Sequence, residues 1–77
     1  MTEPDAVLDL TGIPCPQNAA RTLLRLAMMD EGEILEITLD DGEPIDLVPD
    51  SIDQEGHTIT HREQLADTRW VLRIRVE

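Results

Sequence analysis

Short apolar or alternating segments mark four candidate strands along the chain. They are short, each is bounded by residues that favour turns, and they cover residues 6–10, 33–39, 57–63 and 68–76. The last is the most regular, with inward positions occupied by Trp70, Leu72, Ile74 and Val76. A period of two residues is typical of a strand with one buried face. These four segments are therefore predicted to form the sheet of the fold.

A helical repeat separates the first two candidate strands. Ala20, Leu23, Leu24 and Ala27 recur at the spacing i, i+3, i+4, i+7, which predicts a buried stripe on a helix over residues 16 to about 29. Proline suits the first helical position, because its missing N–H would have no partner there. We therefore expect Leu24 to lie in the core.

A second helical repeat lies between residues 44 and 55, where Ile45, Val48 and Ile52 share one face. Pro49 interrupts this repeat, since proline offers no backbone N–H and clashes with the preceding turn. We expect a short helical turn, a kink, and a second helix start at Pro49.

The predicted order of elements is β-α-β-α-β-β in one domain that covers residues 1–77. The first two strands are expected to be parallel and joined by a right-handed crossover, and the last two to form an antiparallel hairpin around a short polar loop. Both helices then cover one face of a mixed four-stranded sheet, which is a two-layer α/β sandwich. Its core is expected to include Leu35, Ile37, Leu72 and Ile74.

The charge balance narrows the range of partners. Seventeen Asp and Glu residues stand against six Arg and no Lys, for a net charge of −11. Such a chain repels phosphate backbones, and its one aromatic residue, Trp70, offers no platform for stacked bases. Direct nucleic-acid binding is therefore not expected, whereas basic faces of partner proteins are suitable docking surfaces. The alternative is that the acidic surface only keeps the protein in solution.

The N-terminal residues and the number of cysteines indicate the cellular compartment of the protein. The first six residues are polar and acidic without the apolar stretch of a signal peptide, and no apolar run approaches the length of a membrane span. The one cysteine cannot form an internal disulfide. These features predict a cytoplasmic protein without a membrane partner.

Cys15 is the strongest candidate for chemistry because of its position. It lies between Pro14 and Pro16, in the loop after the first strand and at the predicted N-cap of the first helix. Unpaired N–H groups and the positive end of the helix dipole favour an anion there, and so favour the reactive thiolate. Loops at the carboxyl ends of strands also hold the sites of open α/β folds. The alternative is a small buried cysteine that only packs.

The remaining polar residues suggest no catalytic or metal-binding group. His57 and His61 are about 13 Å apart in an extended strand, too far to share one metal ion. Asp40 and Asp41 are neighbours whose side chains point to opposite sides, which favours a turn over an acid–base pair. No cofactor or metal is therefore expected.

Several short motifs together resemble one family. Leu8-Asp9, Gly12 and Cys15-Pro16 reproduce the pattern of the TusA (SirA-like) sulfur carriers, and the likeness covers nearly the whole chain. The resemblance implies the same β-α-β-α-β-β order. It also implies that Cys15 accepts sulfane sulfur as a persulfide from a donor protein, such as a cysteine desulfurase or a rhodanese-like protein. The sulfur would then pass to an acceptor protein for tRNA thiolation, cofactor assembly or sulfur metabolism.

Four residues are expected to support Cys15. Asp9 can accept backbone N–H bonds within the loop, although a merely structural cap explains it equally well. Gly12 and Pro16 shape the loop and the start of the helix. Asn18 stands where the family motif has a second proline. It restores a backbone N–H, which we expect to point at the sulfur of Cys15.

Two functions are compatible with these observations. In the first, the protein is a sulfur carrier with a sulfurtransferase-type activity that depends on Cys15. In the second, the same fold is a non-catalytic interaction or regulatory module that uses its acidic surface. A thiol at a helix N-cap favours the carrier, because a binding module has no need of one. The carrier also requires Cys15 to be at least partly exposed.

Overall fold

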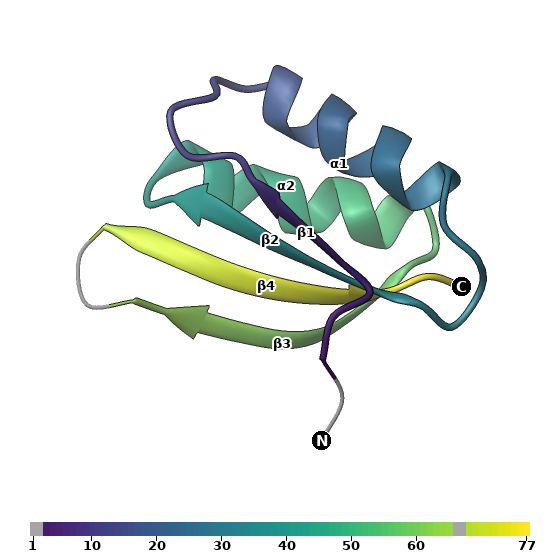
Figure 1. The fold of residues 1–77 in the computed structure, drawn as a ribbon. Helices are drawn as coiled ribbons and strands as arrows, with labels where there is room; N and C mark the ends of the chain where they lie inside the picture. Colours follow the sequence, from purple (N-terminus) through teal and green to yellow (C-terminus); the bar gives the residue numbers. More distant parts are fainter. Residues whose placement is uncertain (1–2, 66–67) are drawn as a thin grey trace.

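The secondary structure follows the predicted order. The computed structural model describes residues 3–65 and 68–77. The elements are β1 (Ala6–Asp9), α1 (Gln17–Ala27), β2 (Ile34–Asp40), α2 (Glu43–Gln54), β3 (Thr58–Gln64) and β4 (Arg69–Arg75) (Figure 1). Each strand boundary lies within one residue of the boundary that the alternating pattern predicts. Residues 66 and 67 of the predicted polar loop lie outside the described residues.

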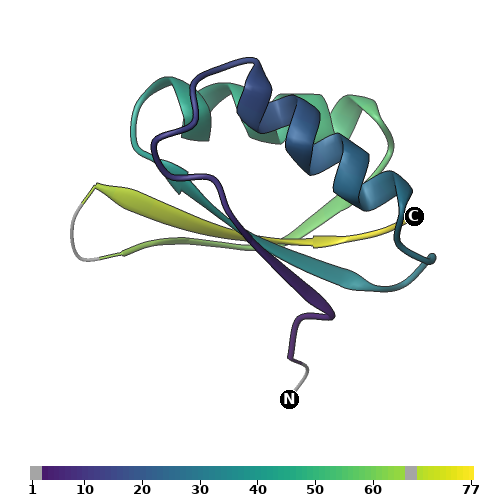
Figure 2. The same cartoon turned by 45° about the horizontal axis from the view of Figure 1, so that its top comes forward.

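The four strands form one mixed sheet in the order β1-β2-β4-β3. β1 runs parallel to β2, with Leu8 opposite Ile37, and α1 makes the crossover between them. β4 is antiparallel to both β2 and β3. Both helices lie on the same face of the sheet, and the described residues place no helix on the other face (Figures 1 and 2). This confirms the two-layer α/β sandwich.

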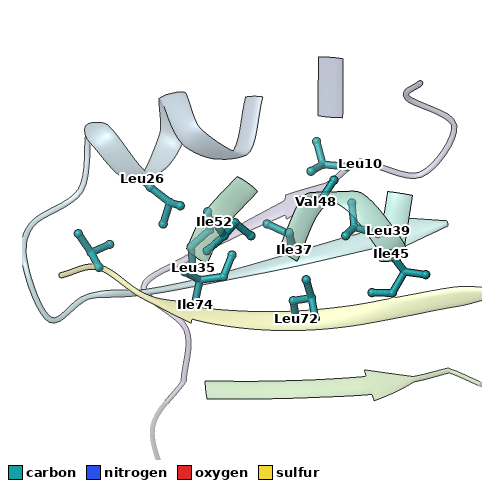
Figure 3. Packing of buried hydrophobic residues seen from close by; sticks show 11 residues of the cluster. Leu10, Leu26, Leu35, Ile37, Leu39, Ile45, Val48, Ile52, Leu72 and Ile74 are labelled. Atoms are coloured by element: carbon teal, nitrogen blue, oxygen red, sulfur yellow. The ribbon is translucent and has the colours of Figure 1, made fainter. Parts of the chain in front are cut away.

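A buried apolar cluster fills the space between the sheet and the helices (Figure 3). At its centre, Leu35 lies opposite Ile74 and Ile37 lies opposite Leu72, and all four side chains are fully buried, as predicted. Burying one such side chain contributes about 1.5–3 kcal/mol. The other members of the cluster are Leu10, Leu26, Leu39, Ile45, Val48, Ile52 and Val76.

α2 is one continuous helix, so the second helix start predicted at Pro49 is wrong. Pro49 lies inside the helix and is buried together with Val48 and Ile52. This face packs on the sheet, and its apolar burial offsets the hydrogen bond that the proline nitrogen cannot donate. Tertiary packing therefore overrides the local effect of proline here.

α1 turns a different face to the core than its apolar repeat predicts. Its buried residues are Asn18, Thr22 and Leu26, whereas Leu24 is 65% exposed. The predicted stripe is wrong because the core-facing positions follow i, i+4, i+8 and include two polar residues. The buried hydroxyl of Thr22 has a hydrogen-bond partner within the helix, since it donates a 2.9 Å hydrogen bond to the backbone oxygen of Asn18. Of the predicted stripe, Leu23 packs on the core, and the exposed members are Ala20, Leu24 and Ala27.

Candidate functional site

The loop that carries Cys15 is anchored in the core where it leaves β1. Leu10 is buried, and its N–H donates a 2.9 Å hydrogen bond to the carbonyl oxygen of Thr38 in β2. Ile13 packs against the same core, and its N–H donates to the carbonyl oxygen of Leu10 at 3.2 Å. Because its backbone groups are paired and its apolar side chains are packed, this part of the loop resists local opening.

Two carboxylates hold the next turn of the loop. Asp9 Oδ1 accepts a 2.7 Å hydrogen bond from the Thr11 hydroxyl and a 3.0 Å bond from the Thr11 backbone N–H. The hydroxyl bond, and then the backbone bond, lower the pKa of the Asp9 carboxyl because they stabilise its charged form. Gly12 has a φ of +78°, which favours glycine, and its N–H donates to Asp40 Oδ2 at 2.6 Å. Asp40, which the sequence pattern assigned only to a turn, is thus an anchor of the Cys15 loop.

The helix begins one residue later than predicted. α1 starts at Gln17 with Pro16 as its N-cap residue, so Cys15 lies just before the cap rather than at it. The Asn18 N–H donates to the carbonyl oxygen of Pro14 at 3.2 Å, so it does not point at the sulfur, contrary to the prediction. Among the described residues, the backbone N–H groups of Cys15 and Gln17 have no hydrogen-bond partner. These two groups are the donors left for an anion at this position.

The Asn18 side chain lies in the interior of the protein. Its Oδ1 accepts a 2.7 Å hydrogen bond from the Ala19 N–H. Its Nδ2 is buried and has no hydrogen-bond partner within the described part of the chain. A buried polar group without a partner costs about 1–3 kcal/mol of stability. The side chain of Asn18 therefore packs in the interior beneath the first turn of α1 and lowers the stability of the fold.

Cys15 is half-buried at a groove between α1 and α2, which confirms that this residue is at least partly exposed. The groove has a volume of about 350 Å³ and is lined by Cys15, Pro16, Ala19, Leu47, Val48, Asp50, Ser51 and Gln54. Its apolar floor meets one carboxylate, one hydroxyl and one amide from α2. The described residues contribute no histidine, no basic residue and no second cysteine to the lining. The groove therefore brings no cation and no second thiol to the sulfur.

The contribution of α2 to this groove could not be predicted from local patterns. Leu47, Asp50 and Ser51 lie more than thirty positions after Cys15, and only the packing of α2 beside α1 brings them together. The one feature of the sequence that could have indicated this contribution is Leu47, an apolar residue on the otherwise polar side of α2. Its side chain is 50% exposed in the structure.

The other residues singled out from the sequence lie elsewhere. His57 Nδ1 accepts a 3.2 Å hydrogen bond from the Glu77 N–H, whereas His61 Nε2 lies 3.1 Å from Glu63 Oε1. Asp41 Oδ1 accepts a 2.9 Å hydrogen bond from Trp70 Nε1. Within residues 3–65 and 68–77, no three His, Cys, Asp or Glu side chains are arranged to hold a metal ion. None of the described helices combines the length and apolar character needed to cross a membrane.

Comparison with known proteins decides the family. The sequence model of the family described as "Sulfurtransferase TusA" matches residues 6–76, which include the whole Cys15 loop. This chain belongs to the TusA family. A relative from Archaeoglobus fulgidus is 36% identical over 73 residues, which cover 95% of this chain and 83% of that protein.

Two further TusA-family relatives come from bacteria. YedF of Escherichia coli K12 is 36% identical over 61 residues, which cover 79% of each chain. A protein from Thermotoga maritima is 30% identical over 70 residues, which cover 91% of this chain and 89% of the relative. All three relatives carry the name "Putative sulfur carrier protein".

Proposed function

We propose that this TusA-family protein is a sulfur carrier that holds sulfane sulfur on Cys15 as a persulfide. The observation that carries the proposal is the placement of Cys15, which is half-buried at a groove and borne on a loop anchored to the core and to Asp40. The names of the relatives support carrier chemistry in this family. A rigid loop with an accessible thiol suits a protein that must present one sulfur atom to successive partners.

Loading is a displacement at sulfur. The Cys15 thiolate attacks the outer sulfur of a donor persulfide, an S–S bond forms on Cys15, the donor S–S bond breaks, and the donor leaves as a thiolate. In unloading, a thiolate of the acceptor attacks the outer sulfur held by Cys15, and Cys15 leaves as a thiolate. Neither step needs an external oxidant or reductant, because the sulfane sulfur moves between thiols at one oxidation level.

The groups around Cys15 supply an environment for an anion rather than a proton relay. The free N–H groups of Cys15 and Gln17 favour a negative sulfur, both as thiolate and as persulfide. The groove offers no cation, and its single carboxylate, Asp50, is exposed. The donor and the acceptor therefore provide the remaining groups that the transfer requires.

We infer two kinds of partner, a sulfur donor of the cysteine desulfurase or rhodanese type and an acceptor protein. A groove of about 350 Å³ can admit a side chain or loop tip of a partner beside the thiol. The net charge of −11 argues against direct contact with the phosphates of a nucleic acid. We place the protein in the cytoplasm, where thiols are kept reduced.

The acidic outer side of α2 favours an alternative function, a non-catalytic interaction module. This helix has four acidic residues and no basic residue: Glu43, Asp46, Asp50 and Asp53 are all exposed. Such a surface can dock a basic partner without any chemistry at Cys15.

Mass spectrometry of the intact protein distinguishes these functions after incubation with a cysteine desulfurase and cysteine. We expect a mass gain of one sulfur atom that a reducing thiol removes. Cys15→Ser should gain no sulfur. Ser51→Ala is the matched control, because it alters the one hydroxyl-bearing side chain of the groove but not the thiol, and it should keep the full gain. Wild-type protein that gains no sulfur from a desulfurase or a rhodanese-type donor contradicts the carrier and favours the interaction module.

A further inference from the structure

A second surface hollow flanks α1 on the side of β1. It has a volume of about 220 Å³ and shares no residue with the Cys15 groove. Its lining, which we call the α1–β1 patch, consists of Leu8, Arg21, Leu24, Arg25 and Met28. Arg21, Leu24 and Arg25 of α1 and its C-cap residue Met28 follow the spacing i, i+3, i+4, i+7, so they form one continuous stripe along the helix.

The apolar members of the α1–β1 patch are unusually exposed. Leu24 is 65% exposed and Met28 is 73% exposed, and both belong to the small set of large apolar side chains that the described residues leave in water. A chain of 77 residues has few apolar side chains to spare from its core. Gathered exposed apolar side chains mark interaction sites, and methionine adapts its shape to different partners.

The arginines of the patch are the second observation. Those with a partner inside the protein are Arg62, Arg69, Arg73 and Arg75. Arg21 and Arg25 form no hydrogen bond or ion pair with any described residue, although the chain has seventeen acidic residues. The fold thus keeps two guanidinium groups, with their five N–H donors each, available beside an exposed apolar stripe.

We propose that the α1–β1 patch docks a segment of a partner protein that presents carboxylates beside an apolar side chain. Arg21 and Arg25 bind the carboxylates through paired N–H···O bonds, and the apolar side chain enters the hollow between Leu24, Met28 and Leu8. Arginine and methionine are also enriched at protein interfaces.

The charge of the chain excludes other occupants. A net charge of −11 opposes approach to an anionic membrane or a nucleic acid at long range, although two arginines alone would favour either. The same charge opposes association of two copies of this chain. A protein partner can instead carry its carboxylates locally and its basic residues elsewhere, where they face the acidic surface of α2.

The patch lies apart from the thiol. Leu24 is seven residues beyond Gln17, where α1 begins, which corresponds to about 10 Å along the helix axis, and Cys15 precedes that start. A partner held on the patch therefore leaves the Cys15 groove open. The docking surface goes beyond the proposed carrier function and does not depend on sulfur transfer.

Titration of ¹⁵N-labelled protein with two synthetic peptides tests the proposal. The first is a helix-forming peptide with leucine on one face and glutamate on the flanks, and its twin has glutamine in place of glutamate. We expect the glutamate peptide to shift the amide signals of 21–28 and Leu8. Its affinity should fall at least about fivefold in R21Q/R25Q and fall in Leu24→Ser, because charge-assisted bonds and apolar contact are lost.

Arg62→Gln/Arg75→Gln is the matched control, since it removes the same number of charges from β3 and β4 and should keep the affinity. The proposal would be overturned if the glutamine peptide bound as tightly as the glutamate peptide, or if the control variant lost as much affinity as R21Q/R25Q. Shifts of amide signals confined to α2 would also overturn it. So would the absence of shifts with the glutamate peptide, binding to anionic vesicles through the patch, or patch signals that shift with protein concentration alone. Cys15→Ser should bind the glutamate peptide as the wild type does, so this test is separate from that of the carrier function.

Discussion

The two helices lie side by side on one sheet but differ in what they bury. α2 buries Ile45, Val48, Pro49 and Ile52, and its outer side is acidic. α1 buries two polar residues and one leucine, and it exposes Leu24, as its C-cap exposes Met28. α2 thus follows the usual rule of apolar inside and polar outside, whereas α1 breaks it on both faces.

This difference separates the scaffold from the surface that meets partners. α2 contributes three apolar residues to the central cluster, and α1 contributes Leu26. α1 instead follows the Cys15 loop at one end and carries the α1–β1 patch along its length. Departures from local rules are expected where a protein performs its function, because packing is then not the sole constraint on the residues. Four experiments test whether the two helices differ in this way.

The largest contrast is expected from apolar truncations on the two helices. Ile52→Ala in α2 removes a fully buried side chain and should lower the free energy of unfolding by about 2–5 kcal/mol. Leu24→Ala in α1 removes an exposed side chain and should change it by less than about 0.5 kcal/mol. Urea unfolding followed by Trp70 fluorescence measures both. Similar losses would show that the helices support the core equally.

Substitution of Asn18 is expected to raise the free energy of unfolding, by less than the loss in Ile52→Ala. Asn18→Leu replaces the unpartnered buried amide by an apolar side chain of similar size and should raise the free energy of unfolding by about 1 kcal/mol. Thr22→Val is the matched control, since the Thr22 hydroxyl has a partner and its removal should give no gain. The same urea titration measures both variants. A loss of stability in Asn18→Leu would show that the amide is well accommodated.

Two proline substitutions at the start of α1 test which backbone N–H groups affect the reactivity of Cys15. Gln17→Pro removes a free N–H near the sulfur and should slow alkylation of Cys15 at fixed pH and salt about two- to fivefold, the usual effect of helix-terminal groups. Asn18→Pro removes an N–H that is already bonded to Pro14 and should leave the rate nearly unchanged. Iodoacetamide kinetics measure both. If Asn18→Pro is the slower variant, the Asn18 N–H reaches the sulfur in solution.

The smallest effect concerns the turn that Asp9 holds. The pKa of Asp9 is lowered by the Thr11 hydroxyl and N–H, so its stabilising effect is fully present above the unfolded-state pKa of about 3.9. It is lost as the pH falls through the lowered folded-state pKa. Hydrogen exchange should therefore show Thr11 N–H protection, corrected for intrinsic rates, that is constant near neutral pH and declines in acid. Asp9→Asn should abolish this decline, and a decline that persists would assign it to another group.

Local patterns predicted the sheet well and α1 poorly, for one physical reason. In β2 and β4 the alternating pattern allows only one face of each strand to be buried. A shift by one residue would expose Leu35, Ile37, Leu72 and Ile74 together. In α1 the apolar residues surround much of the helix, and several faces satisfy the helical spacing. Asn18 and Thr22 could take the buried face because Thr22 bonds within the helix. No pattern of apolar residues reports such a bond.

The candidate site divides in the same way. Local sequence was enough to predict that Cys15 lies in a proline-flanked loop between a strand and a helix, since prolines and turn residues act through local geometry. The groups that surround Cys15 could be found only from the folded protein. Asp40 reaches the loop through the pairing of β1 with β2, and Leu47 and Asp50 reach the thiol through the packing of α2 beside α1. Contacts between residues thirty positions apart depend on how whole elements pack, and that is set by the summed burial of the core.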